Sequence, residues 1–417
     1  MAFRPSNSQG RSSRPGQGRN NRTSFGPPRH AGGGRSSGGG NRRGAYIHPS
    51  KFINKAVAPA EEIVYEAKHT FADFAFSDAL QKNIADKGYT IPSAIQDQAI
   101  PFILEGKDVI GLANTGTGKT AAFALPIIQN LSKDDFAPAV LIMAPTRELA
   151  QQIDEQFRQY GKGLGFFSAI CVGGMNIDRQ IRDLRRRPHV IIGTPGRLKD
   201  LMNRRELNLE TIKVVVLDEA DRMMDMGFVD DMKMILGKTP KERQTLFFSA
   251  TITPSIQTLT QQFLKDPEVV SVRTTETSEH VEQDIIESPT KEAKLEILTE
   301  LLKASEFEKV LVFGETKFGV QRLSDHLERE GFTSAAIHGN KSQSQRQRAL
   351  MAFKSNKVTI LVATDVAARG LDIPNVSHVI NFDQPATYED YVHRIGRTGR
   401  GGARGKAFTF VPTQSNR

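Results

Sequence analysis

Two α/β domains in tandem, each a mostly parallel sheet with helices on both faces, are the fold that the sequence predicts. Short runs of β-branched and apolar residues alternate along the chain with longer stretches of helical spacing. A polar stretch at 273–283 interrupts this alternation, which then starts again. A chain of 417 residues is long enough for two domains. We therefore expect domains at 70–272 and 284–417, joined by a linker at 273–283.

The expected strands are short and bounded by polar residues. In the first domain they are 108–113, 139–144, 167–172, 190–193, 214–217 and 245–249. In the second domain they are 309–313, 334–337, 359–363, 378–381 and 407–411. Segments between them, such as 147–162 and 177–186, have the apolar spacing of helices. Strands that alternate with helices in this way pair in parallel.

Residues 1–45 differ in composition from the rest of the chain. They are mainly Gly, Ser, Asn, Pro and Arg, with Phe3 and Phe25 as the large apolar groups. They hold nine Arg and no acid, while the remaining residues hold 47 basic and 47 acidic groups, so the net charge of +9 lies here. Such a segment buries too little apolar surface to fold. We expect a disordered arm that attracts a polyanion, with a solubilising tail as the alternative, followed by an N-terminal extension at 46–69.

Several classes of protein are excluded by composition. A single cysteine, Cys171, rules out an internal disulfide framework and a zinc site built from cysteines, and it suits a reducing compartment. No apolar run approaches the length of about 18 residues that predicts a membrane span. The first 45 residues lack the apolar core of a secretory signal. The sequence predicts a cytoplasmic protein with no membrane partner.

A phosphate-binding loop is predicted where the strand 108–113 meets the next helix. The sequence from 113 to 120 reads Ala-Asn-Thr-Gly-Thr-Gly-Lys-Thr, and a helix-forming run follows it. Small residues let backbone N–H groups wrap phosphates, and the helix N-terminus adds a favourable field. Lys119 would reach the β and γ phosphate oxygens, and Thr120 would bind Mg²⁺. The other residues expected to contact the nucleotide here are Thr115, Gly116, Thr117 and Gly118.

An acidic pair follows the apolar strand 214–217. Asp218 and Glu219 would lie at the carboxyl edge of the sheet, where an enzyme with such a loop holds its metal and positions water. Asp218 would bind Mg²⁺, and Glu219 would orient or deprotonate the attacking water. The sequence therefore predicts a site that hydrolyses a nucleoside triphosphate.

The run Asp-Glu-Ala-Asp at 218–221 resembles the signature of the DEAD-box RNA helicases, and the resemblance extends from about Phe71 to Phe410. It implies two RecA-like domains. It also includes the adenine-reading element of the family, which lies at 88–96 with Phe71 placed 17 residues before it. By resemblance, Gln96 hydrogen-bonds the adenine edge and Tyr89 stacks on the ring. An amide suits adenine because it presents a donor and an acceptor together.

The resemblance also implies an RNA site and a coupling element. Hydroxyls, loop N–H groups and Arg side chains bind the phosphates of single-stranded RNA without reading bases. In the first domain these residues are Pro145, Thr146, Arg147, Gly173, Gly174, Thr194, Pro195, Gly196 and Arg197, and in the second they are Gly339, Arg346, Thr364 and Asp365. The residues implied in coupling the domains are Asp221, Ser249, Thr251 and His393.

Two further nucleotide contacts and a pair of arginine fingers are implied in the second domain. By resemblance, Gly370 and Asp372 touch the nucleotide, while Arg397 and Arg400 face the γ-phosphate. The two arginines are three residues apart, so on one helical turn both guanidinium groups can face the same side.

The resemblance implies an RNA-stimulated ATPase, using ATP and Mg²⁺, that separates RNA duplexes locally or remodels RNA–protein complexes. With the acids in one domain and the fingers in the other, hydrolysis would need the domains to close on ATP and RNA together. Backbone contacts predict little sequence preference. An ATP-gated RNA clamp with little unwinding and a DNA translocase are the alternatives.

Deleting residues 1–45 should weaken RNA binding at low salt and leave the maximal ATPase rate at saturating RNA nearly unchanged. Each neutralised phosphate of a single strand adds about −0.7 to the log–log salt slope, so the nine Arg set an upper bound of about −6. Measuring RNA affinity against salt concentration for both forms checks this. An unchanged slope would show that the arm does not bind RNA, and a collapsed maximal rate would place it in the catalytic cleft.

Overall fold

The computed structural model describes residues 47–54, 65–114, 116–131, 138–272, 281–368, 376–399 and 405–413. The chain divides into two units, Met1–Arg43 and Gly44–Arg417, and all described residues belong to the second. The predicted arm, most of the predicted linker, and the site residues Thr115, Gly370, Asp372 and Arg400 lie outside the described residues. What was predicted for them stays a prediction.

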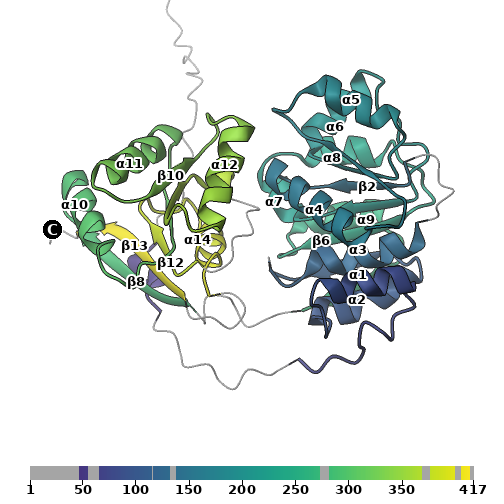
Figure 1. Cartoon of the computed structure of the whole chain (residues 1–417), viewed down its shortest axis with the longest axis horizontal. Coiled ribbons are helices and arrows are strands. Elements are labelled where there is room, and N and C mark those ends of the chain that lie inside the picture. Colours follow the sequence, from purple (N-terminus) through teal and green to yellow (C-terminus); the bar gives the residue numbers. More distant parts are fainter. Residues whose placement is uncertain are drawn as a thin grey trace, which may run out of the picture. The chain divides into compact units, whose positions relative to one another are not determined.

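The first sheet has seven strands in the order β3-β4-β2-β5-β6-β1-β7, and every pair is parallel (Figure 1). The strands are β1 Val109–Leu112, β2 Val140–Met143, β3 Ser168–Cys171, β4 Val190–Gly193, β5 Val214–Leu217, β6 Gln244–Ser249 and β7 Glu268–Ser271. The helices are α1 Asp78–Asp86, α2 Ala94–Leu104, α3 Lys119–Asn130, α4 Arg147–Tyr160, α5 Ile177–Arg185, α6 Pro195–Asn203, α7 Ala220–Asp225, α8 Val229–Leu236 and α9 Pro254–Phe263.

Both faces of the first sheet are buried, because alternate residues of one strand enter two different cores. In β2, Val140 and Ile142 pack into one cluster while Leu141 and Met143 pack into the other. A strand has a side-chain period of two, so these clusters lie on opposite faces. This explains why the strands are continuous apolar runs instead of alternating ones.

The second sheet has six parallel strands in the order β10-β11-β9-β12-β13-β8. They are β8 Val281–Ser288, β9 Val310–Phe313, β10 Ser334–Ile337, β11 Ile360–Ala363, β12 His378–Asn381 and β13 Gly405–Pro412. The helices are α10 Lys291–Leu301, α11 Lys317–Arg329, α12 Gln343–Lys354, α13 Asp365–Ala368 and α14 Tyr388–Ile395. The predicted pair of parallel sheets with helices on both faces is confirmed (Figure 1).

Two edge strands were not predicted. β7 pairs with β1, and β8 pairs with β13 along its whole length. β8 begins at Val281, so the last residues of the predicted linker 273–283 belong to the second sheet and the boundary at 284 is wrong. The sequence of β8 is Val-Glu-Gln-Asp-Ile-Ile-Glu-Ser, and this polar strand is fixed by its neighbour more than by its own hydrophobicity.

Part of the predicted extension 46–69 also packs on the second sheet. A short 3₁₀ helix, η1 Pro49–Phe52, buries the Phe52 ring completely. Asn54 then forms an isolated antiparallel bridge with Gln283 of β8. Residues that precede the first domain in the sequence therefore pack as part of the second domain.

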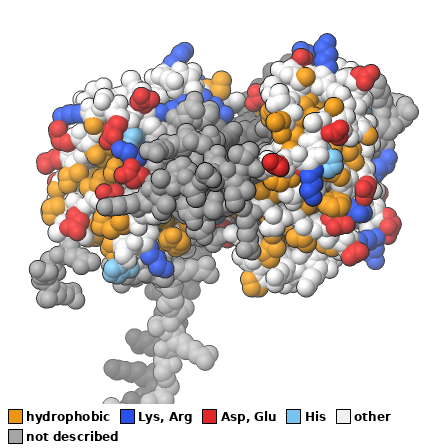
Figure 2. Space-filling model, turned by 90° about the horizontal axis from the view of Figure 1, so that it is seen from below, with side chains coloured by type: hydrophobic (Ala, Val, Ile, Leu, Met, Phe, Trp, Pro, Cys, Tyr) orange, Lys and Arg blue, Asp and Glu red, His pale blue; other side chains and the backbone are white. Residues whose placement is uncertain are grey.

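The charges at the surface and the burial of the single cysteine are consistent with what the composition predicts. The face shown in Figure 2 carries basic and acidic side chains interspersed, as expected for equal numbers outside the arm. Cys171 is fully buried at the end of β3, and burial raises the pKa of its thiol to about 12. Within the described residues, no helix has both the length and the apolar character needed to cross a membrane.

His378 on β12 is the most strongly perturbed histidine among the described residues. Its ring stacks on Phe307 at a centroid distance of 4.1 Å and lies parallel to Phe408 at 6.1 Å. The Nδ1 atom is 3.0 Å from the Ser377 hydroxyl, while the buried Nε2 has no hydrogen-bond partner among the described residues. Burial in this stack lowers the pKa of His378 to about 4. The folded domain therefore holds the neutral ring.

Acid should destabilise the second sheet through His378. Between pH 6.5 and 4 the unfolded chain binds a proton that the folded chain excludes, so stability falls as pH falls through this window. At pH 5 the loss relative to pH 7 is about 2 kcal/mol. His378→Phe keeps the ring stack and does not titrate, so it should remove most of this difference. Hydrogen exchange of the β9 and β12 amides, corrected for the intrinsic rate, measures it, and an equal pH response in both proteins would contradict the assignment.

Candidate functional site

The predicted phosphate-binding loop connects β1 to α3. Gly118 adopts a left-handed φ of +93° immediately before the helix, and a Cβ at this position would collide with the Gln96 amide. Lys119 is buried and donates from Nζ to the Ala113 carbonyl at 2.9 Å. Thr117 donates from its hydroxyl to the Asn114 carbonyl at 2.8 Å. The lysine thus lies folded over the loop, where a phosphate can take the place of the carbonyl.

Gln96 lies in the first turn of α2, and hydrogen bonds join it to the predicted phosphate-binding loop. Its Oε1 accepts from the Ser93 N–H at 3.0 Å, and its Nε2 donates to the Gly118 carbonyl at 3.1 Å. The Ser93 hydroxyl donates to the Thr117 carbonyl at 2.8 Å. An amide has two donor hydrogens and two acceptor lone pairs, so one of each is left. A remaining donor and acceptor of this kind are suited to the edge of an adenine.

The aromatic residues predicted to hold adenine lie together. Phe71 stacks on Tyr89 with ring centroids 6.1 Å apart and planes 22° apart. Phe71 is buried, whereas Tyr89 is 37% exposed and its hydroxyl lies 3.2 Å from that of Tyr160. The exposed ring of Tyr89 is thus available to a base, and Phe71 supports it.

Asp97, next to Gln96, anchors the chain that leads to Phe71. Its buried carboxylate accepts from the Lys68 N–H at 2.8 Å, the His69 N–H at 3.1 Å and the Tyr65 hydroxyl at 2.5 Å. Burial would raise the pKa of Asp97, but these hydrogen bonds outweigh it and lower the pKa. Sequence reasoning missed this residue, although an acid in the apolar stretch Ala94–Leu104 was a signal.

The acidic run begins directly after β5. Asp218 is 2% exposed, and its Oδ1 has no hydrogen-bond partner among the described residues. Burial raises its pKa to about 7, against the attraction of Lys119. A buried carboxylate oxygen without a partner fits a hard cation such as Mg²⁺. Thr120, one residue after Lys119, is the other residue that could hold it.

The described residues contain no group of three or more His, Cys, Asp or Glu side chains arranged around a metal. Mg²⁺ is commonly bound by one or two protein oxygens together with substrate phosphates and waters. The donor set of Asp218 and Thr120 suits that mode of binding.

Glu219 has a left-handed backbone, with φ +52° and ψ +52°. The other residues with positive φ that are not glycine are exposed, whereas Glu219 is 5% exposed. Such a conformation costs about 1–3 kcal/mol and commonly marks a functional site. The carboxylate pairs with the buried guanidinium of Arg222. Burial would raise the pKa of Glu219, but the charges of nearby cations, Arg222 first among them, together outweigh it and lower the pKa.

Asp221 joins the acidic run to the loop that follows β6. Its Oδ2 accepts from the Ala250 N–H at 2.9 Å, the Thr251 N–H at 3.1 Å and the Thr251 hydroxyl at 3.4 Å. Ser249 donates from its hydroxyl to the Thr251 carbonyl at 2.8 Å. The structure therefore places three of the residues predicted to couple the domains in direct contact.

The residues predicted to bind RNA in the first domain follow β2, β3 and β4, which are neighbours in the sheet. The Arg147 guanidinium packs against Gly174, where any side chain would collide with it. Thr146 and Thr194 immediately precede α4 and α6, and Pro195 is the first residue of α6. Arg197 donates to the Gln180 side chain at 3.0 Å and to the Met175 carbonyl at 3.4 Å. The loops 145–147, 173–174 and 194–197 thus lie at one edge of the first sheet. The hydrogen bonds of Arg197 hold neighbouring segments of this edge together.

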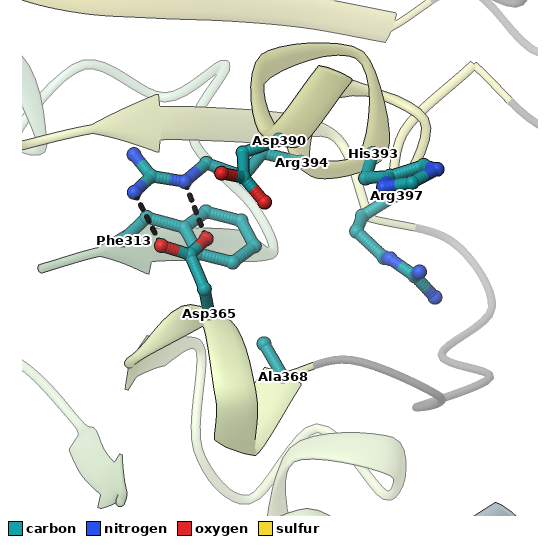
Figure 3. Close-up of a pocket in the computed structure, with 7 residues that line it drawn as sticks. All are labelled: Phe313, Asp365, Ala368, Asp390, His393, Arg394 and Arg397. Atoms are coloured by element: carbon teal, nitrogen blue, oxygen red, sulfur yellow. Dashed lines mark hydrogen bonds and ion pairs between the residues drawn. The ribbon is translucent and has the colours of Figure 1, made fainter. Parts of the chain in front are cut away.

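In the second domain, two of the predicted RNA ligands have ionic partners. Asp365 accepts from Arg394 through both carboxylate oxygens, at 2.6 and 2.7 Å (Figure 3). Its backbone N–H, not its carboxylate, is the group suited to a phosphate. Arg346 lies 3.0 Å from Glu148, which also accepts from Gln343 at 3.2 Å. Gly339 is exposed, and Thr364 precedes α13 at the end of β11.

Arg397 and His393 lie in a small pocket with Phe313, Ala368, Asp390 and the Asp365–Arg394 pair. The side chain of Arg397 points away from that pair (Figure 3). Arg394 was not singled out from the sequence. Its bidentate contact fixes α14 and therefore the start of the segment that carries Arg397.

Comparisons with known proteins agree with this arrangement. The DEAD/DEAH box helicase family matches residues 93–259, and the helicase conserved C-terminal domain matches 293–402. The chain is 47% identical over 342 residues to the ATP-dependent RNA helicase CshA of Limosilactobacillus reuteri, covering 82% of this chain and 69% of that protein. S. cerevisiae Dbp5 bound to RNA and ADP BeF3 has a TM-score of 0.74 and 32% identity, covering 83% of this chain and 90% of that one. The DEAD-box helicase Mss116 bound to ssRNA and UDP-BeF has a TM-score of 0.76 and 30% identity, covering 82% and 74%.

Two RecA-like sheets, with the predicted phosphate-binding loop and the buried acids in the first, are typical of ATP-dependent enzymes of the helicase class. With these relatives, the chain belongs to the DEAD-box family of ATP-dependent RNA helicases.

Replacing Lys119 by Ala should lower ATP turnover at least 100-fold, since loss of one preorganised cationic donor to a transferring group costs about 10²–10³ in rate. The fold should survive, because the helix is held by the apolar residues that follow the lysine. Steady-state ATPase measurements with RNA check this. Lys162→Ala, at an exposed lysine of the same domain, is the matched control. RNA-stimulated turnover at the wild-type level in Lys119→Ala would refute the phosphate-loop assignment.

Proposed function

We propose that this chain couples ATP hydrolysis to the closing and opening of its two domains on single-stranded RNA, and so separates RNA duplexes locally or remodels RNA–protein complexes. The observation that carries the proposal is the buried acidic run after β5. There, one Asp218 oxygen has no hydrogen-bond partner among the described residues, and Glu219 has a left-handed backbone. A strained, buried acid pair beside a phosphate-binding lysine is suited to phosphoryl transfer to water.

In the proposed mechanism, the first domain binds the nucleotide. The remaining donor and acceptor of Gln96 take the adenine edge, and Tyr89, supported by Phe71, stacks on the ring. Lys119 exchanges the Ala113 carbonyl for phosphate oxygens. The loop N–H groups at 115–118 surround the phosphates. Asp218 and Thr120 would hold Mg²⁺, which supplies positive charge to the β and γ phosphates.

Glu219 is the proposed base. Its lowered pKa keeps it ionised at neutral pH, so it can accept the proton of the attacking water. The ion pair with Arg222 fixes the direction of the carboxylate. Arg397, together with Arg400, would stabilise the charge that develops on the γ-phosphate. Gly370 and Asp372 are the remaining proposed nucleotide contacts.

Coupling follows from the division of the machinery between two sheets. The phosphate loop and acids belong to the first sheet, and Arg397 follows α14 of the second. Stabilisation from both sides therefore requires the domains to close on ATP. The proposed RNA ligands are divided in the same way, so ATP and RNA bind cooperatively by linkage. Asp221 with Ser249 and Thr251 would connect the acids to this closure, with His393 beside Arg397 on the other side.

RNA is the proposed polymer, bound as a single strand through its backbone and with little sequence preference. Dbp5 and Mss116, whose folds this chain shares, have been solved with RNA and ssRNA respectively. The balanced charge of the folded part and the single buried cysteine suit a protein of the cytoplasm, which is the proposed location.

An unwinding assay at catalytic enzyme levels tests the proposal. With ATP, the protein should displace the short strand of an RNA duplex that has a single-stranded overhang, over many turnovers. RNA should also stimulate the ATPase more than DNA of the same sequence. RNA-stimulated hydrolysis without strand displacement would favour the clamp, and equal stimulation by DNA would favour a translocase.

Glu219→Gln should lower the hydrolysis rate about 10²–10⁴-fold, the usual contribution of a general base. The amide keeps the size and can still accept from Arg222, while Asp218 is unchanged. RNA with ATP should then dissociate more slowly than from the wild type. Glu155→Gln, an exposed acid on α4, is the control, and thermal melting verifies the fold. Dissociation of RNA at the wild-type rate would show that Glu219 does not position the water.

A further inference from the structure

Residues 47–54, here named the N-terminal segment, pack on the second sheet beside β8 (Figure 1). The Phe52 side chain is completely buried and belongs to the same core cluster as Tyr391 and Ile395 of α14. The rings of Phe52 and Tyr391 have centroids 4.7 Å apart. A segment that the sequence suggested was a simple extension therefore forms part of a domain core.

The segment is held by backbone as well as side chains. The Asn54 N–H donates to the Gln283 carbonyl at 3.0 Å, and the Gln283 N–H donates to the Asn54 carbonyl at 2.8 Å. The Lys51 ammonium lies 5.5 Å from the centre of the Tyr388 ring. The N-terminal segment thus contacts both β8 and the first turn of α14.

Tyr391 is the residue through which these contacts reach the candidate site. It is completely buried, and its hydroxyl donates to Gln283 Oε1 at 2.9 Å and, more weakly, to the Phe52 carbonyl at 3.5 Å. Three residues later, Arg394 is held by both oxygens of Asp365. Arg397 lies two residues after the last residue of α14, Ile395. The position of α14 is thus fixed by Asp365 at Arg394 and by the N-terminal segment at Tyr391.

We infer that the N-terminal segment positions α14, and through it Arg397, for the phosphoryl-transfer step. The inference rests on the proposed function, in which Arg397 faces the γ-phosphate. Phe52 is a positioning residue, since its partners are Tyr391 and the core of the second domain. Neither matched family region, 93–259 or 293–402, includes the segment. A displacement of about 1 Å at a catalytic group can cost as much as about 100-fold in rate.

The test uses the full chain with Phe52→Ala. The RNA-stimulated kcat should fall about three- to thirtyfold, while KM for ATP and the Kd for single-stranded RNA stay within about twofold. The matched control is Ile53→Ala, because the neighbouring side chain is 48% exposed and should leave all three constants unchanged. Phe52→Leu, which keeps most of the buried volume, should restore kcat toward the wild type. If Phe52→Ala fails to fold by circular dichroism, Phe52→Leu carries the test, with a smaller loss of kcat expected and KM unchanged.

Coupling to Arg397 separates a positioning role from a general loss of stability. In an Arg397→Ala background, Phe52→Ala should lower kcat no further, because the group that it positions is gone. Effects that multiply, or a wild-type kcat in Phe52→Ala and Phe52→Leu, would overturn the inference while leaving the role of Arg397 intact. A wild-type kcat in Arg397→Ala would refute the proposed function of that arginine, and the inference with it.

Discussion

The burial of three carboxylates at the end of β5 is the constraint on which the rest of the candidate site depends. Burying a charge costs free energy unless an opposite charge or hydrogen bonds stabilise it, and the surroundings of the three acids differ in this respect. Arg222 pairs with Glu219, while N–H groups after β6 bind Asp221. One Asp218 oxygen has no hydrogen-bond partner in the described part of the chain, and burial raises the pKa of this carboxyl. The end of β5, the start of α7 and the loop after β6 must therefore lie within hydrogen-bond reach of one another, and Asp218 is the acid suited to the proposed Mg²⁺.

Strand order divides the candidate site residues at the carboxyl edge of the first sheet into two groups. β1, β5 and β6, which lead to the phosphate loop, the acids and the Ser-Ala-Thr loop, are neighbours. β2, β4 and β3, which lead to the proposed RNA loops, are neighbours on the other side of β5. Along the chain, β2, β3 and β4 lie between β1 and β5. Parallel pairing thus places the two sets of proposed ligands at separate parts of one sheet edge.

Local chemistry explains what could be predicted from the sequence. The buried strands are apolar runs, and the prediction located them within one or two residues. β7 and β8 were missed because edge strands with polar sequences depend on a neighbour for burial. The candidate site residues were predicted from motifs that occur in a fixed order along the chain. The residues that hold them in place were not predicted, because they belong to no such motif. Asp97 binds partners about 30 residues earlier, and Phe52 meets Tyr391 across a separation of 339 residues, which no local pattern reports. The ion pair between Glu219 and Arg222 could have been predicted from the sequence, because the two residues are only three positions apart.

The burial of Cys171 has a practical consequence for observing this protein at work. A thiol with a pKa of about 12, enclosed at the end of β3, presents almost no thiolate to solvent at neutral pH. Thiol-directed reagents would therefore leave the natural protein unmarked. A cysteine introduced at an exposed position on each domain could carry a fluorophore without background labelling. Energy transfer between the two dyes would then follow the distance between the domains during each catalytic cycle, with the native cysteine left in place.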